Sequence, residues 1–153
     1  MNPRLDYGKA APEGRKAFSA VQAYIQNCSL PRELIDLVYL RVSQINGCAF
    51  CIDKHSRDLL RLGLSADKLA LVPVWHEAGA LFSEREQAAL AWAETVTRVS
   101  ETGVPDADYQ AVAARFGERE LADLTYAIAL MNAMNRLAIP FRLTPAAAAA
   151  LRK

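Results

Sequence analysis

The sequence predicts an all-α fold, and two observations support this prediction. Apolar residues recur at steps of three and four along most of the chain, which is the period of helices that bury one face. Signals for strands are nearly absent, and turns containing glycine or proline separate the periodic stretches. The length of 153 residues suits one domain with its own hydrophobic core. We therefore expect a single helical bundle over residues 1–153.

The first expected helix has an apolar stripe at helical spacing, formed by Phe18, Val21, Ile25 and Cys28. In this position Cys28 has a plain explanation as a small buried apolar residue. Pro31 opens the second helix, because proline is tolerated in a first turn, and Asn46-Gly47 ends it. This second helix is apolar nearly all round, which is typical of a central, heavily buried element.

A third helix begins near Cys48 and ends at Gly63, a suitable residue for a C-terminal cap. Ser65 begins a short helix through about Val72, which Pro73 interrupts.

Ser83 and Glu86 have the spacing of a capping box, so a long helix is expected to begin there. Its core stripe is Ala89, Trp92, Val96 and Val99. Beyond it we expect a turn at 103–105 and helices at 106–116, 118–138 and 146–151. The inward residues of the last long helix are Leu121, Leu124, Ile128 and Met131.

The bulk composition excludes several classes of function. The formal net charge is +1 and there is no basic block, so nucleic acid and anionic membranes are poor partners. The apolar runs are too short to span a bilayer, and the first residues lack the apolar core of a signal peptide. Three cysteines, an odd number, suit a reducing compartment. We expect a cytoplasmic protein.

The most informative motif places Cys48, Cys51 and His55 three and four residues apart. On a helix this spacing puts the two thiols and the imidazole on one face. Two thiols one turn apart can form a disulfide, and an imidazole one turn further can accept a proton. The motif therefore indicates a dithiol redox site.

Three other interpretations compete with redox chemistry. Structural zinc usually needs four ligands, and the only further candidates here are the isolated Cys28 and His76. A static disulfide between residues three apart would constrain little chain and stabilise weakly. The third alternative is two buried cysteines with a core histidine, since His55 lies in an apolar stripe with Ile52, Leu59 and Leu62. We favour redox chemistry and assign no metal.

Sulfur chemistry needs the thiolate, and a helix start, a second thiol and His55 could each favour it. A histidine that acts as a base is usually oriented by a carboxylate or carbonyl. The preceding helix offers Asp36 on a face shared with Tyr39 and Ser43, and Glu33 lies one turn before Asp36. A buried carboxylate needs a partner, which favours a role for Asp36, whereas Glu33 could equally be solvated near the helix start.

The segment S-Q-I-N-G-C-A-F-C at 43–51, followed by His55, closely resembles the AhpD-like alkylhydroperoxidases of the carboxymuconolactone decarboxylase superfamily. Residues 82–97 and 132–137 fit a peroxidase-related branch, and the resemblance covers roughly 30–142. It implies an all-helical fold, a trimer or hexamer, and peroxide reduction by a C-x-x-C pair that cycles through a disulfide.

The resemblance also implies roles for individual residues. Cys51 corresponds to the cysteine that attacks peroxide, Cys48 to the resolving cysteine and His55 to the histidine of a proton relay. The relay acid, usually a glutamate, is Asp36 here, and Glu33 is the alternative. Some members have a histidine between the cysteines, where this chain has Phe50.

We therefore expect a peroxidase-type oxidoreductase for alkyl hydroperoxides or hydrogen peroxide. It would need no cofactor beyond an external dithiol reductant, either a lipoyl group or a thioredoxin-like protein. The alternative is a non-catalytic redox sensor or disulfide-exchange module. The superfamily's decarboxylases lack the C-x-x-C pair, so its presence argues against lyase activity.

Overall fold

The computed structural model describes residues 2–151, and this part of the chain contains ten α-helices, two 3-10 helices and no strand. The all-α prediction is confirmed. In chain order the elements are α1 (Tyr7–Ala10), α2 (Pro12–Gln26), α3 (Arg32–Asn46), α4 (Ala49–Arg61), α5 (Ala66–Leu71), η1 (Val72–Glu77), η2 (Gly79–Leu81), α6 (Glu84–Thr97), α7 (Val99–Thr102), α8 (Asp106–Ala113), α9 (Glu118–Ala138) and α10 (Ala146–Ala150).

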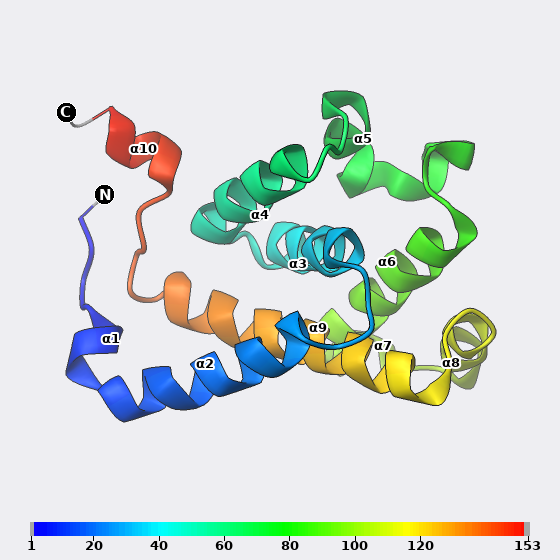
Figure 1. Cartoon of the computed structure of the whole chain (residues 1–153), viewed down its shortest axis with the longest axis horizontal. Helices are drawn as coiled ribbons and strands as arrows, with labels where there is room; N and C mark the ends of the chain where they lie inside the picture. The colour runs from blue at the N-terminus through cyan, green and yellow to red at the C-terminus, as the bar shows by residue number, and fades with distance from the viewer. Residues whose placement is uncertain (1, 152–153) are drawn as a thin grey trace.

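Helix α3 lies at the centre of the bundle and packs against α4, α6 and α9 (Figure 1). Nine of its 15 residues are buried, as its nearly uniform apolar sequence predicts. Val38 packs into a cluster with α2 and α9, whereas Leu37 packs on another face of α3 with residues of α4 and α6. Complete burial of one such side chain contributes about 1.5–3 kcal/mol. The central helix therefore fixes the positions of all its neighbours.

Gly47 separates α3 from α4 and allows the sharp change in direction between them. Its φ of 70° lies in the left-handed region, which glycine adopts without steric cost. The amide of Cys48 then donates to the carbonyl of Ser43 at 2.9 Å. As a result, Cys48 occupies the N-cap of α4.

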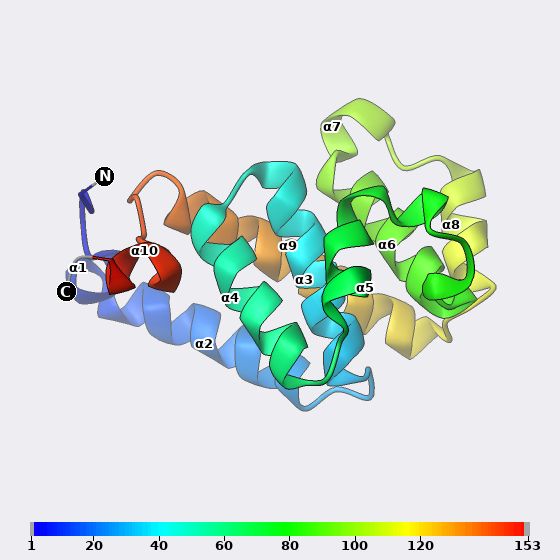
Figure 2. The same cartoon turned by 90° about the horizontal axis from the view of Figure 1, so that it is seen from above.

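The two ends of the described chain lie at the same end of the molecule as α1 and α10 (Figure 1 and Figure 2). The rings of Tyr7 and Phe141 stack with centroids 5.6 Å apart, and the Arg4 amide donates to the Phe141 carbonyl. The amide of Ala147 donates to Asp53 of α4 at 3.3 Å, so α10 is attached to the helix that contains Cys51 and His55.

The second half of the chain matches several sequence predictions closely. Ser83 and Glu86 form the expected reciprocal capping box at the start of α6. Helix α9 has the predicted bounds, 118–138. Its predicted inward residues are all buried: Leu121, Leu124, Ile128 and Met131.

Three expectations are wrong, and one helix was missed. Phe18 and Val21 of α2 are 36% and 41% exposed, because no element among residues 2–151 covers that face of the helix. Cys28 is half-buried rather than buried, in the connection between α2 and α3. Val99 is 56% exposed, since the backbone departs from helical geometry at Arg98 and ends α6 there. Helix α1 was not expected at all.

No helix of the described residues is both long enough and apolar enough to cross a membrane.

Candidate functional site

The two cysteines of the motif lie together at the start of α4. Their Sγ atoms are 2.7 Å apart, and the side chains of Cys48 and Cys51 are buried, with 1% and 5% of their surface exposed. Both are free thiols. The helical spacing predicted this proximity. The turn at Gly47 produces it by placing Cys48 at the N-cap of α4.

The two thiols perturb each other's ionisation. A hydrogen bond from Cys51 lowers the pKa of Cys48 to about 7, although burial opposes the shift, and the Cys51 amide and the Asn135 side chain lower it further. The same hydrogen bond and burial raise the pKa of Cys51 well above its ordinary value. The pair therefore loses one proton near neutral pH and holds the second strongly. A single negative charge is shared across one S–H···S contact.

His55 is held by a buried carboxylate on α3. Its Nδ1 lies 2.9 Å from Oδ1 of Asp36, and the other oxygen of Asp36 accepts from Nε of Arg32 at 2.7 Å. Tyr39, one turn along α3, packs edge-on against the imidazole with ring centroids 5.0 Å apart. The imidazole is thus fixed from two directions.

Asp36 is ionised at neutral pH. Burial would raise its pKa, but the hydrogen bonds from His55 and Arg32 outweigh burial and leave the pKa below its ordinary value. An ionised carboxylate can only accept hydrogen bonds. Nδ1 of His55 must therefore be the protonated nitrogen, which leaves the lone pair on Nε2 free to accept a proton.

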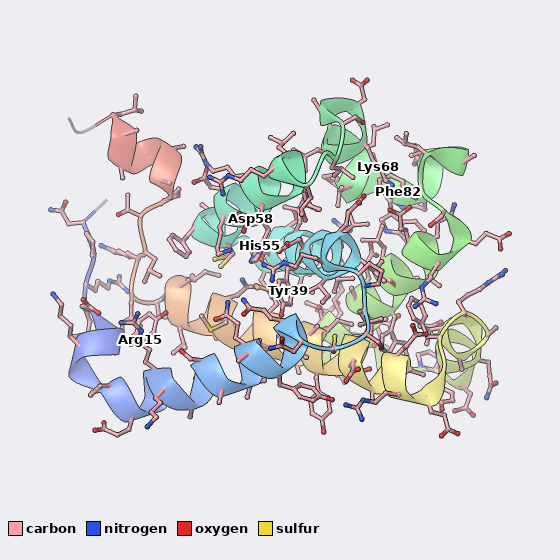
Figure 3. The ribbon with its side chains drawn as sticks, viewed as in Figure 1. Arg15, Tyr39, His55, Asp58, Lys68 and Phe82 are labelled. Carbon is pink, nitrogen blue, oxygen red and sulfur yellow. The ribbon has the colours of Figure 1, made fainter. Side chains whose placement is uncertain are left out.

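A cavity of about 170 Å³ opens onto Cys51 and His55 but not onto Cys48. Helices α2, α3, α4 and α9 enclose it, and Figure 3 shows His55 and Tyr39 where α3 and α4 face the layer of α2 and α9. Its apolar wall is formed by Ile25, Ile35, Phe50, Leu130, Met131 and Met134. A small apolar molecule in this cavity would contact the sulfur of Cys51 and the imidazole of His55.

The structure separates the remaining candidates from this site. Glu33 is half-buried and its side chain forms no hydrogen bond with any of residues 2–151, so the carboxylate at His55 is Asp36. Cys28 lies outside the cavity wall. His76 is exposed in η1 and pairs loosely with Glu77 at 3.9 Å.

A metal centre at the cysteines finds no support in the described part of the chain. The one group of three possible ligands in residues 2–151 is Asp36, His55 and Asp58, which includes neither thiol. Arg32 already pairs with Asp36, while Lys54 and Arg61 pair with Asp58. These cations would oppose the binding of another positive ion.

Two residues at the site escaped the sequence analysis. Arg32 precedes Asp36 by four residues, a spacing that predicts an ion pair on a helix. Asn135 donates to Ser43 Oγ at 3.2 Å, and its side chain helps to lower the pKa of Cys48. No local pattern could reveal that contact, because 92 residues separate Asn135 from Ser43.

Two comparisons of sequence identify relatives of this chain. The model of the carboxymuconolactone decarboxylase family matches residues 12–95. The uncharacterized protein YdfG of Bacillus subtilis is 35% identical over 139 residues, which are 91% of this chain and 94% of that protein.

Solved structures extend the similarity to the whole fold. A protein of unknown function from Agrobacterium tumefaciens, provisionally described as the antioxidant defence protein AhpD, is 40% identical with a TM-score of 0.90. The match covers 94% of this chain and 98% of that one. A peroxidase-related protein of Ralstonia eutropha with an AhpD core is 22% identical, with a TM-score of 0.79 over 91% of this chain and 74% of its own. This second structure shows the shared fold alone.

Proposed function

Because the chain belongs to the carboxymuconolactone decarboxylase family, we propose that it is a thiol-dependent peroxidase acting on alkyl hydroperoxides or hydrogen peroxide. The main support is one observation: Cys51 and His55 line the same cavity while Asp36 holds the imidazole. The provisional description of the A. tumefaciens protein as an antioxidant defence protein points the same way.

In the first step the thiolate at Cys51 attacks the outer oxygen of the hydroperoxide. The O–O bond breaks, the sulfur becomes a sulfenic acid and the alkoxide leaves as an alcohol after taking a proton. Cys51 is the attacking residue because it lines the cavity, whereas Cys48 does not. Because its pKa is raised, Cys51 starts as the thiol, and it becomes the thiolate when its proton passes to Nε2 of His55.

In the second step Cys48 attacks the sulfenic sulfur, so that a disulfide forms and water leaves. The two thiols already lie in contact, which makes this step faster than further oxidation of Cys51. An external dithiol then reduces the disulfide by exchange and is itself oxidised. A lipoyl group or a thioredoxin-like protein in the cytoplasm would supply these two electrons.

His55 moves the proton in the first step. Its Nε2 accepts the proton of the thiol and returns it to the departing alkoxide, which is general acid–base catalysis. Asp36 fixes the tautomer and stabilises the imidazolium, and Arg32 holds Asp36. No metal or organic cofactor takes part in this proposal.

The alternative function is a redox sensor, in which the same pair oxidises once and signals through a partner. The burial of both sulfurs favours the enzyme, since a small peroxide can enter the cavity more easily than a protein surface can reach the thiols.

We further propose that the protein assembles as a homo-oligomer, a trimer or a hexamer. Phe18, Val21 and Tyr24 of α2 are exposed, and Tyr126 of α9 extends this apolar face with 57% of its surface exposed. The rings of Tyr24 and Tyr126 are in edge contact at 6.1 Å. Large exposed apolar patches are typical of interfaces. Light scattering showing a monomer at micromolar concentration would reject this assembly.

The function is tested by following peroxide consumption with the reduced full-length protein. Tert-butyl hydroperoxide, cumene hydroperoxide and hydrogen peroxide are each offered with dihydrolipoamide or a thioredoxin system, and the Cys48→Ser/Cys51→Ser double variant is the control. We expect repeated turnover with at least one pair of substrates. One equivalent of peroxide consumed, with no turnover for any dithiol, would establish the sensor instead.

A further inference from the structure

A second cavity, of about 440 Å³, lies between α1, α2 and the C-terminal end of α9, and the proposed mechanism does not use it. We call it the outer cavity. One wall is a face of α2 that includes Arg15 and Gln22, and another is formed by Met134 and Leu137 of α9. Most of its lining is apolar. The outer cavity is more than twice as large as the cavity at Cys51, which measures about 170 Å³.

The outer cavity adjoins the cavity at Cys51 and His55. Gln22 and Met134 line both cavities, so these two side chains form the partition between them. Neither side chain is fully buried, and both are unbranched and flexible. A change of their rotamers would let one extended molecule occupy both cavities at once.

Among residues 2–151, Arg15 supplies the only charge in the wall of the outer cavity. Figure 3 shows Arg15 on the side of α2 that faces the end of α9. The carboxylate of Asp6 also lies beside Gly8, but it accepts from the amides of Gly8 and Lys9 and pairs with Lys9 Nζ at 3.7 Å. No carboxylate of the described chain forms an ion pair with Arg15. Its guanidinium N–H groups are therefore available to an anion in the cavity.

Helix α1 restrains the side chain of Arg15. A Cβ added at Gly8 would lie 3.0 Å from Cδ and 3.4 Å from Nη1 of Arg15, so the arginine side chain packs over this glycine. A side chain that is already restrained loses less conformational entropy when it binds a ligand. The contact with Gly8 thus prepares the guanidinium for an anion.

An apolar cavity that contains one cation fits a carboxylic acid with a hydrocarbon chain. Burial of the chain is favourable for each CH₂ group, and a guanidinium can bind a carboxylate through two parallel hydrogen bonds. Arg15 and Gln22 are seven residues apart on α2, about 10 Å along the helix axis. A carboxylate on Arg15 therefore places the cavity at Cys51 about eight carbon atoms along the chain, given carbon–carbon bonds of about 1.5 Å.

We propose that the outer cavity binds the acid end of a fatty acid, with the carboxylate on Arg15, and that the preferred substrates of Cys51 are fatty-acid hydroperoxides with the peroxide in the middle of the chain. The chain would run from Arg15 past Met134 to Cys51, where the hydroperoxide is reduced to a hydroxy acid by the two steps described above. The binding site stands on the cavity and on Arg15, whereas the substrate class rests on the proposed peroxidase function.

The binding site is tested by isothermal titration calorimetry of the reduced full-length protein with decanoate, which contains no peroxide. Decyltrimethylammonium has the same alkyl chain with the opposite charge and is the control ligand. The Arg15→Gln variant is compared with Lys16→Gln. Both variants remove one positive charge from an exposed position of α2, but Lys16 lines neither cavity.

Decanoate is expected to bind about tenfold more tightly than decyltrimethylammonium. Arg15→Gln should weaken the binding of decanoate about tenfold, because a charge-assisted contact is lost. Lys16→Gln should change it by less than about twofold, since its charge is screened by solvent. Three results would each overturn the proposal: no binding of decanoate at millimolar concentration, equal binding of the two ligands, or equal losses in the two variants.

The substrate class is tested with a hydroperoxy fatty acid and its methyl ester, which differ in the charge of the acid end. The wild type should show a kcat/KM about tenfold higher for the acid, and Arg15→Gln should remove this preference through KM. The rate with cumene hydroperoxide should be the same in both proteins. Equal kcat/KM for acid and ester in the wild type would refute the substrate class and leave the peroxidase function standing. Binding of decanoate through Arg15 without consumption of any peroxide would support the site and refute the peroxidase function.

Discussion

Two carboxylates each accept hydrogen bonds from an arginine of the central helix and from a ring nitrogen, yet only one of them adjoins reactive groups. Asp36 accepts from Arg32 Nε at 2.7 Å and lies 2.9 Å from a ring nitrogen of His55. Glu94 of α6 accepts from Arg41 Nε of α3 at 2.7 Å and from the ring nitrogen of Trp75 at 2.8 Å. Each carboxylate thus accepts a ring N–H and a guanidinium N–H, and Glu94 also accepts from Arg98 Nη1 at 3.5 Å.

The difference lies in the ring and in what the ring faces. The indole of Trp75 can only donate a hydrogen bond, whereas the imidazole of His55 has a second nitrogen that can accept a proton. His55 lines a cavity shared with Cys51. Trp75 instead packs against the apolar cluster that contains Leu37, Phe82 and Leu90. A carboxylate held by arginine and a ring N–H is therefore not by itself a sign of catalysis.

The largest difference between the surroundings of Asp36 and those of Glu94 is expected when the cysteines are replaced, because nothing around Glu94 takes part in sulfur chemistry. Cys51→Ser should abolish peroxide consumption. Cys48→Ser should react once and stop as a sulfenic acid on Cys51, since the resolving thiol is gone. Trapping with dimedone followed by mass spectrometry identifies the modified residue. Sulfenic acid trapped on Cys48 in the Cys51→Ser variant at the wild-type rate would reverse the two roles.

Replacing His55 should change the rate of the reaction with peroxide, whereas replacing Trp75 should change the stability of the fold. His55→Ala is expected to slow the reaction with peroxide about 10²–10⁴-fold, the usual value of general acid–base assistance. Trp75→Phe removes a donor from Glu94 and should lower the free energy of unfolding by about 1–3 kcal/mol, with the rate unchanged. Stopped-flow kinetics and urea unfolding of both variants measure these effects. An unaltered peroxide rate in His55→Ala would make His55 a core residue, equivalent to Trp75.

Replacing the two carboxylates should give the same contrast on a smaller scale. Asp36→Asn should slow peroxide reduction about 10–100-fold, the cost typical of losing the outer partner of a functional histidine. Glu94→Gln should leave the rate unchanged. Glu33→Gln is the matched control on α3, because Glu33 makes no hydrogen bond with residues 2–151. A larger loss in Glu33→Gln than in Asp36→Asn would transfer the relay role to Glu33.

The smallest effect concerns stability in acid, where the two clusters should behave alike. Burial would raise the pKa of both Asp36 and Glu94, but their hydrogen bonds with His55 and Arg32, and with Trp75 and Arg41, leave both pKa values lowered. A lowered pKa adds stability that is fully present above the ordinary carboxyl value of about 4 and is lost as pH falls through the lower folded-state value.

Asp36→Asn and Glu94→Gln should therefore each weaken the decline of the unfolding temperature between about pH 5 and pH 2. Thermal unfolding across this range measures the slope for each variant. A decline in either variant as steep as in the wild type would show that its carboxylate does not contribute.

Local signals in the sequence predicted most of the helices and part of the site. Ser83 and Glu86 marked the start of α6, and the period of Leu121 and Leu124 identified the buried face of α9. Helical spacing also placed Asp36 on a face that could meet the next helix. These predictions succeed because capping and burial depend on residues within one or two turns.

The rest depended on contacts between distant parts of the chain. The exposure of Phe18 and Val21 could not be predicted, because periodicity shows which face is apolar but not whether another element covers it. The bond between Asn46 and Asn135 joins residues 89 apart. The choice between Asp36 and Glu33 required the relative rotation of α3 and α4, which no local pattern encodes.

In the proposed cycle, the burial of the two sulfurs limits how wide the external dithiol that reduces them can be. With 1% and 5% of their surface exposed, Cys48 and Cys51 offer little surface to another folded protein. A slender dithiol on a flexible arm could enter a space of about 170 Å³, whereas a broad one would first have to unwind the start of α4. The fold would then admit only narrow electron donors to Cys48 and Cys51 and would keep the bulk thiols of the cell away from them.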